Sequence, residues 1–169
     1  NQINFLRKYP QIQGSVYFSS SSFNRNPNGW NDTLRNNYYK YPAIPPPMPW
    51  IDSIKPEAPI LVLDSAKSNF YTTSIDLYFR EKEEDNFINR YVIYQFSDLN
   101  DMDQNDPKNI KEIILAGNNF YHFIIENIPP GQNKIVIAAT SLTKTNNESI
   151  LSPYICLERS GNGWKIITK

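Results

Sequence analysis

The sequence has one histidine, His122, and one cysteine, Cys156, and this scarcity excludes several classes of site. One cysteine cannot form an internal disulfide, and the two residues together cannot supply the ligands of a usual zinc cluster. A Cys–His pair or a histidine-based triad would depend on these two residues alone. The six glycines are scattered, so no phosphate-binding loop occurs either. The sequence therefore predicts no metal centre and no cofactor.

The sequence also lacks a charge excess and long apolar runs. Its 17 Lys and Arg residues balance 17 Asp and Glu residues, so the net charge is zero. A nucleic-acid partner is recognised through a basic excess that is missing here. The longest apolar runs, such as residues 135–139, fall far short of the roughly 20 residues that cross a bilayer. We therefore expect no nucleic-acid partner and no membrane span.

Proline is concentrated at one end of the chain. Residues 1–55 hold seven of the 13 prolines and only two carboxylates, Asp32 and Asp52. Residues 42–49 read Pro-Ala-Ile-Pro-Pro-Pro-Met-Pro and must be extended, because proline fixes φ and biases its predecessor away from helix. We call residues 42–55 the proline-rich segment and expect it to be a semi-rigid linker.

Before that segment, three short elements are predicted. Residues 1–9 favour a helical stretch that Pro10 stops. Residues 14–19 favour a strand that leads into a polar serine run. Asn31 or Asp32 is the expected cap of a short helix that runs through Tyr39.

After residue 56, short apolar stretches separated by polar turns predict seven strands and no confident helix. Seven short strands in about 100 residues are typical of an immunoglobulin-like sandwich. The turn at residues 161–163 and the apolar residues after it predict an additional edge hairpin. The seven strands are expected near residues 60–63, 73–79, 90–96, 111–115, 120–125, 134–140 and 154–158.

Alternation along two of these strands predicts core residues. Ile75, Leu77 and Phe79 share one face of the second strand, and Tyr91 and Ile93 share one face of the third. We expect these faces to be buried between the two sheets.

Residues 118–131 read Asn-Asn-Phe-Tyr-His-Phe-Ile-Ile-Glu-Asn-Ile-Pro-Pro-Gly, and with the strand that follows they resemble the second half of a fibronectin type III domain. The resemblance implies that Phe123, Ile125 and Ile128 point inward and that His122 points outward. It also implies a fibronectin type III-like sandwich over residues 56–158.

The earlier residues carry a second resemblance. They include Gly-Ser-Val-Tyr-Phe-Ser at 14–19, Asn-Gly-Trp-Asn-Asp at 28–32, and a Tyr-Pro-Ala to Met-Pro-Trp stretch at 41–50. This block resembles the end of the glycosyl-hydrolase-10-like family of bacterial secreted proteins, in which a (β/α)-barrel precedes a fibronectin type III-like domain. The resemblance implies that the chain is a C-terminal fragment of a secreted, periplasmic or cell-surface protein.

The domain organisation follows from the two resemblances. We expect the last barrel strand and helix in residues 1–41, the linker in 42–55, the sandwich in 56–158, and a tail with an edge hairpin in 159–169. The fold class is thus mainly β, with a partial barrel remnant ahead of the sandwich. The expected partner is an upstream catalytic barrel of the same polypeptide.

Glycoside hydrolysis normally needs two carboxyl groups about 5 to 9.5 Å apart. Asp32 and Asp52 are more typical of helix caps or turns, so we assign no catalytic residue. The resulting interpretation is a non-catalytic C-terminal accessory or structural module of a secreted glycoside hydrolase that acts on polysaccharide. The alternative is a carbohydrate-binding or adhesion-type β-sandwich.

Two sets of residues are candidates for contacting sugar. Active sites of barrels lie at the carboxyl ends of the strands, so residues just after the expected strand could line a sugar pocket in the intact parent. Exposed aromatic rings could stack on sugar faces, although packing is their commoner use. The pocket candidates are Ser20, Ser21 and Phe23, and the stacking candidates are Trp30, Tyr41, Trp50 and Trp164.

An acidic loop offers a calcium alternative. Asp101, Asp103, Asn105 and Glu112 occupy positions 1, 3, 5 and 12 of a calcium-loop template. Position 6, however, is Asp106, where the template requires glycine. A solvated connection between strands is the other reading of this loop.

Overall fold

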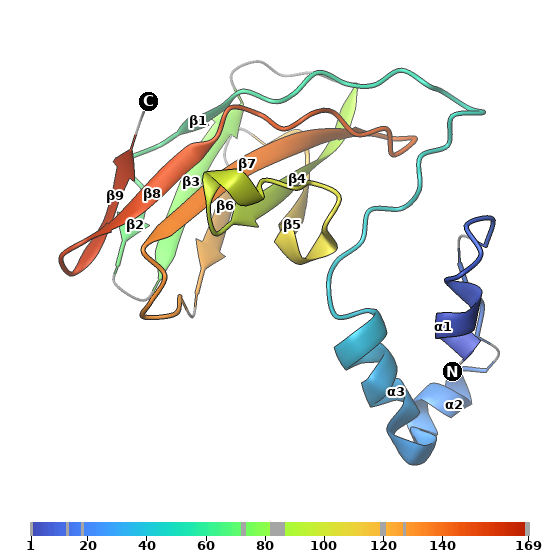
Figure 1. Ribbon diagram of the computed structural model, residues 1–169. Helices are drawn as coiled ribbons and strands as arrows, with labels where there is room; N and C mark the ends of the chain where they lie inside the picture. The colour runs from blue at the N-terminus through green and yellow to red at the C-terminus, as the bar shows by residue number, and fades with distance from the viewer. Residues whose placement is uncertain are drawn as a thin grey trace. The chain divides into compact units, whose positions relative to one another are not determined.

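The computed structural model describes residues 2–12, 14–17, 19–71, 74–81, 87–118, 121–126 and 128–167. It divides into two compact units, and the boundary falls between Lys40 and Tyr41. We call the first the helical unit and the second the sandwich unit (Figure 1). In the described part of the chain, no helix has the length and apolar character that crossing a membrane requires.

The helical unit is made of short helical pieces. They are α1 (Gln2–Leu6), α2 (Ser20–Arg25), the 3₁₀ turn η1 (Pro27–Gly29), α3 (Trp30–Thr33) and the π-helical turn η2 (Leu34–Tyr38). The helix predicted to run through Tyr39 is therefore present as α3 and η2. The predicted cap is wrong, because Asn31 and Asp32 lie inside α3. Instead, the side-chain oxygen of Asn26 accepts the backbone N–H of Asn31 at 2.7 Å.

The strand predicted at residues 14–19 is a second correction. Residues 14–17 and 19 form no strand, and the serine run after them begins α2. A strand is defined by its ladder of hydrogen bonds to a neighbour. No segment in the described part of this unit pairs with residues 14–17, so their β-type sequence has nothing to join.

Two antiparallel sheets form the sandwich unit. In the first sheet, β3 (Ile75–Glu81) is central, because β1 (Leu61–Leu63) and β2 (Asn69–Phe70) pair in succession with one of its edges and β6 (Tyr121–Ile125) pairs with the other. The second sheet has the order β5-β4-β7-β8-β9. Its strands are β4 (Ile88–Phe96), β5 (Ile110–Leu115), β7 (Lys134–Thr143), β8 (Ile155–Ser160) and β9 (Gly163–Ile167).

Strands occur at all seven predicted positions, and β8 with β9 forms the predicted edge hairpin. The two-residue strand β2 was not predicted, since so short a segment has no alternation to detect. Two 3₁₀ turns, η3 (Leu99–Asp101) and η4 (Pro107–Asn109), lie in the connection from β4 to β5.

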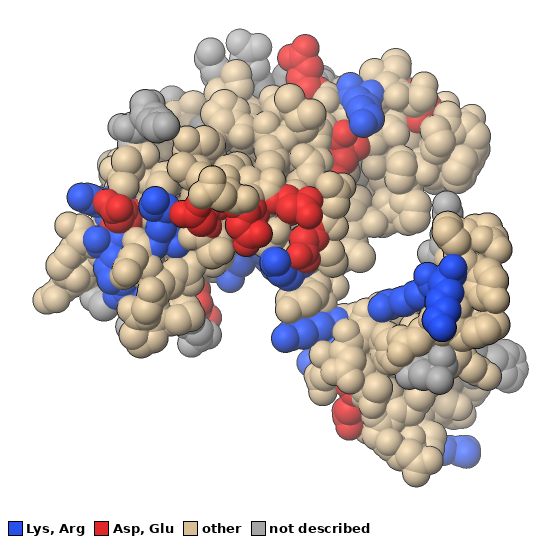
Figure 2. All heavy atoms as spheres, viewed as in Figure 1, with Lys and Arg blue, Asp and Glu red and all other residues tan. Residues whose placement is uncertain are grey.

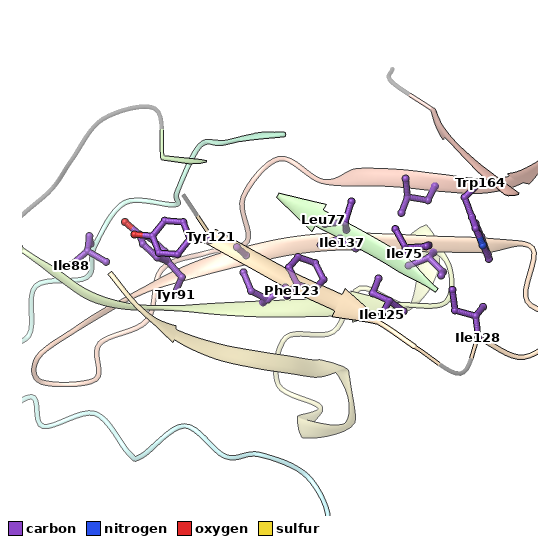
Figure 3. Close-up of a cluster of buried hydrophobic side chains, with 14 residues drawn as sticks. Ile75, Leu77, Ile88, Tyr91, Tyr121, Phe123, Ile125, Ile128, Ile137 and Trp164 are labelled. Carbon is purple, nitrogen blue, oxygen red and sulfur yellow. The ribbon is translucent and has the colours of Figure 1, made fainter. Parts of the chain in front are cut away.

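The main core lies between the two sheets (Figure 3). Ile75 and Leu77 of β3 are fully buried, and so is Ile93 of β4. The alternation therefore predicted these core faces correctly; the side chain of Phe79 lies outside the described residues. The inward set taken from the fibronectin resemblance, Phe123, Ile125 and Ile128, is also buried, and His122 is exposed.

A second apolar cluster covers the other face of the five-stranded sheet. It contains Val92, Tyr94 and Phe96 of β4 together with Val136 and Ala138 of β7. Strands buried on both faces read as continuous apolar runs rather than alternating ones, as β4 and β7 do.

The proline-rich segment helps to cover this second cluster. Ile44 packs against it, and the backbone N–H of Met48 donates to the oxygen of Thr145 at 2.9 Å. The side-chain nitrogen of Asn147 donates to the backbone oxygen of Asp52 at 2.8 Å. The segment therefore belongs to the sandwich unit.

Candidate functional site

The helical unit contains a hollow of about 570 Å³ that we call the Trp30 hollow. Its walls combine aromatic rings, hydroxyl groups and an amide, the groups that fix the orientation of a small polar ligand. The lining residues are Tyr17, Ser22, Pro27, Asn28, Trp30 and Thr33.

Unusual backbone conformations shape this hollow. Asn26, Asn28 and Gly29 have φ of 44°, 55° and 68°, in the left-handed region that asparagine and glycine tolerate best. Ser19, just before α2, has φ of 81°. A residue held in a sparsely populated region of this kind costs of order 1–3 kcal/mol and is enriched near functional sites.

Three aromatic rings pack together at the hollow: Tyr17 and Trp30 line it, and Phe23 packs against Trp30. The centroids of Tyr17 and Trp30 are 5.5 Å apart with nearly perpendicular rings, and those of Phe23 and Trp30 are 4.9 Å apart. Such edge-to-face and tilted pairs contribute about 0.5–1.5 kcal/mol each beyond the area they bury. The hydroxyl group of Tyr17 also shares a hydrogen bond of 3.2 Å with that of Tyr39, and this bond raises the pKa of Tyr17.

The structure brings only some of the predicted residues to this hollow. Trp30 lines it, and Phe23 packs against the Trp30 ring. Ser20 and Ser21 lie exposed on α2, and the hydroxyl of Ser21 bonds that of Ser19 at 2.8 Å rather than facing the hollow. Ser22 was not predicted, because the serine run was expected to follow the end of a strand. The chain instead forms the helix α2 there, and Ser22 lines the hollow.

A turn signature in the sequence lies directly before Trp30. Asn-Pro-Asn-Gly at residues 26–29 is a strong turn signature, because asparagine and glycine readily adopt positive φ. A turn directly before Trp30 brings Asn28 and Trp30 to the same wall.

The other stacking candidates have different environments. Trp50 and Tyr41 are 78% and 45% exposed in the sandwich unit, so their rings are accessible. Trp164 is a correction, because it is 6% exposed and packs in the main core. The guanidinium of Arg159 lies 4.9 Å from the centre of its ring. Packing, the commoner use of such rings, is therefore the role of Trp164 in this structure.

The two carboxylates considered for catalysis make local hydrogen bonds. Asp32 accepts a bond of 2.7 Å from the side-chain nitrogen of Asn26. Asp52 accepts the backbone N–H of Ile54 at 2.9 Å, which is an Asx turn. Each carboxylate thus fixes a turn in its own unit.

The acidic loop uses its carboxylates in the same way. Asp103 accepts the backbone N–H of Asn105 at 2.9 Å, and hydrogen bonding from Lys108 lowers the pKa of Asp106. In the described part of the chain, no three His, Cys, Asp or Glu side chains gather as a metal ion requires, so Asp101, Asp103 and Glu112 do not form the calcium set. Figure 2 shows acidic side chains gathered in a band across the visible face of the sandwich unit, with basic side chains at one end of the band and beside it.

Comparison with curated proteins gives one partial similarity. The chain is 40% identical over 60 residues to "Glycosyl hydrolase YngK" of Bacillus subtilis (strain 168). The match covers 36% of this chain but only 12% of that protein's length. No family model matches the chain, and no solved structure matches it significantly. The similarity relates the chain loosely to a glycosyl hydrolase.

Proposed function

We propose that this chain is a non-catalytic accessory module of a secreted glycoside-hydrolase-like protein that acts on polysaccharide. The observation that carries the proposal is the attachment of the proline-rich segment to the five-stranded sheet. Through it, any domain that precedes Tyr41 would be joined to a rigid body rather than to a flexible tether. The similarity to a much longer glycosyl hydrolase supports this role.

The attachment is held by several kinds of contact. Ile44 packs on the second apolar cluster, and the backbone of Met48 bonds that of Thr145. Asn147 is 6% exposed and bonds Asp52. A hydrogen bond of this kind contributes about 0.5–1.5 kcal/mol, and the prolines reduce the entropy that ordering the segment costs. Together these contacts make the segment a structural support.

The sandwich is proposed to be fibronectin type III-like. The strand order supports this. If the two-residue strand β2 is left out of the count, β5 is the fourth strand, and it pairs with the third strand, β4. In constant-type immunoglobulin domains the fourth strand instead joins the sheet formed by the first, second and fifth strands. On this proposal residues 1–41 are the end of a (β/α)-barrel, and the catalytic acids lie on earlier strands of that barrel.

The test compares the longer gene product with and without residues 41–169. The accessory role predicts that the truncated protein melts at a lower temperature and hydrolyses its polysaccharide more slowly at 37 °C. Unchanged melting and unchanged hydrolysis would rule the role out. A parallel assay of this chain alone should release no reducing sugar; release that disappears in Asp32→Asn or Asp52→Asn would contradict the non-catalytic assignment.

The second candidate function is carbohydrate binding by the module itself. It is favoured by the 78% exposure of Trp50, which leaves an indole face free for stacking on a sugar. Retention of the chain on insoluble polysaccharide that is lost in Trp50→Ala, but kept in Trp164→Phe, would support binding. Equal retention of Trp50→Ala and the unmodified chain would exclude Trp50 as the contact.

A further inference from the structure

A second hollow, of about 360 Å³, lies in the sandwich unit between the prolines and the turn that follows β7. We call it the Glu148 hollow. Its volume is within the range of about 300–1,000 Å³ typical of small-molecule sites. It is lined by Ile44, Pro45, Pro46, Pro47, Lys55, Gln104, Asn105, Asn146, Asn147 and Glu148.

The carboxylate of Glu148 is fixed by two buried hydroxyl groups. Tyr94 and Thr140, both with 0% exposure, donate hydrogen bonds of 2.6 Å to the same oxygen, Oε1. Hydrogen bonds to a charged acceptor are short and about twice as strong as neutral ones. The two bonds hold the carboxylate in one orientation before any ligand arrives.

Two polar atoms of the lining have no hydrogen-bond partner among the described residues. Oε2 of Glu148 accepts no hydrogen bond from any described residue. Asn146 is 8% exposed, and its oxygen accepts from Arg90 at 3.5 Å, but its side-chain nitrogen donates to no described residue. An unused acceptor and an unused donor therefore line the same hollow.

The backbone of Asn146 holds its amide in place. Its φ is 61°, and its backbone N–H donates to the oxygen of Thr143 at 3.1 Å. The neighbouring amide of Asn147 is occupied by Asp52 and Thr145, so it is not available to a ligand. Neither Oε2 of Glu148 nor the side-chain nitrogen of Asn146 is among the fully buried unpartnered atoms of the described residues. Both atoms are therefore accessible to a ligand that enters the hollow, which would exchange their bonds to water for bonds to itself.

The chemistry of the lining selects the ligand class. Its two charged residues, Glu148 and Lys55, have opposite signs, so the lining has no net charge with which to select an ion. Pro45, Pro46 and Pro47 supply apolar ring surface beside the amides. A sugar hydroxyl both donates and accepts, and a pyranose ring has an apolar C–H face, which together match this combination.

We propose that the Glu148 hollow binds a neutral pyranose residue of a polysaccharide, with Oε2 of Glu148 accepting from one hydroxyl group and the side-chain nitrogen of Asn146 donating to another. This goes beyond the accessory role, which needs no ligand, and it does not use the exposed aromatic rings.

The test is isothermal titration calorimetry of the whole 169-residue chain with cellohexaose, xylohexaose, mannohexaose and maltohexaose. Glu148→Gln keeps an oxygen for Tyr94 and Thr140 but replaces the free acceptor by a donor. Asn146→Gly removes the side chain at a φ that glycine adopts freely. Glu158→Gln is the matched control, because Glu158 does not line the hollow and its carboxylate makes a surface ion pair of 3.7 Å with Lys165.

The proposal predicts that the unmodified chain and Glu158→Gln bind at least one hexasaccharide equally well. Glu148→Gln and Asn146→Gly, verified as folded by circular dichroism, should bind it at least tenfold more weakly. If Glu148→Gln does not fold, Asn146→Gly decides the matter. Absence of binding to all four sugars, or unchanged affinity in the folded variants, overturns the proposal. The accessory role would survive either result, because its test measures melting and hydrolysis by the longer protein.

Discussion

The side-chain nitrogen of Asn147 donates a hydrogen bond of 2.8 Å to the backbone oxygen of Asp52, a residue 95 positions earlier in the chain. The same nitrogen lies 3.2 Å from the hydroxyl of Thr145. One buried amide thus ties the end of the proline-rich segment to the turn after β7.

Replacing this amide should loosen the segment. Asn147→Ala leaves the oxygen of Asp52 without its donor, so we expect the free energy of unfolding to fall by about 1–2 kcal/mol. Urea denaturation measures the change. Asn133→Ala, at an exposed loop position, should stay within about 0.5 kcal/mol of the unmodified chain. Equal stability of the two variants would contradict a structural role for Asn147.

Ile44 tests the apolar side of the same attachment. Ile44→Ala removes methylene and methyl groups that pack on the second apolar cluster. Because the side chain is only partly buried, we expect a loss of about 1–2 kcal/mol, below the range for a fully buried isoleucine. The matched control is Ile54→Ala, since Ile54 is 64% exposed. A linker that does not pack on the sheet would make both substitutions neutral by thermal melting.

Gly163 fixes the approach of the edge hairpin to the other sheet. A Cβ atom at this position would lie 2.8 Å from the backbone oxygen of Phe70, which is too close for contact. Gly163→Ala should therefore cost about 1–3 kcal/mol through overpacking. Gly131→Ala is the control, because nothing lies within 4 Å of the added atom there. Differential scanning calorimetry should show a lower melting temperature for Gly163→Ala only.

Because of Tyr94, the free energy of unfolding is expected to fall as the pH rises into the alkaline range. Burial, together with the hydrogen bond to Glu148, raises the pKa of Tyr94 far above its ordinary value of 10.0. The folded state thus keeps a proton that the unfolded state releases, so this contribution is intact below pH 10 and is lost as the pH rises above it. Each pH unit then costs about 1.4 kcal/mol.

Tyr94→Phe isolates this effect. The variant should be less stable at pH 8, because it leaves the carboxylate of Glu148 with one donor fewer. Between about pH 10 and pH 11.5, however, its free energy of unfolding should fall less steeply than that of the unmodified chain, by about 1.4 kcal/mol per unit. Parallel slopes in urea titrations would show that Tyr94 ionises normally.

The sandwich could be predicted from the sequence because its information is local. Alternation identified Ile75, Leu77 and Ile93, and turn residues separated the strands. The strand predicted at residues 14–19 was wrong, because a β-like sequence forms a strand only where a neighbouring segment pairs with it. Its sequence is β-like, but no described segment of the helical unit lies alongside to pair with it.

The Glu148 hollow could not be predicted because it depends on long-range contacts. Glu148 was visible only as part of a polar loop, and nothing local indicates that Tyr94, 54 residues away, bonds its carboxylate. For Trp164 the local sequence led to the wrong prediction, an exposed ring, whereas the side chain is buried. A tryptophan beside a tight turn suggests exposure, but the pairing of β8 with β9 turns it into the core.

The proline-rich segment is part of the folded sandwich unit rather than a flexible linker. Native-state hydrogen exchange of the backbone amide of Met48, followed by NMR, tests it most directly, because this N–H bonds the oxygen of Thr145. We expect the Met48 amide to exchange orders of magnitude more slowly than an unstructured amide and to lose its protection in Asn147→Ala. Exchange at the rate of an unstructured chain, with β7 still protected, would contradict it.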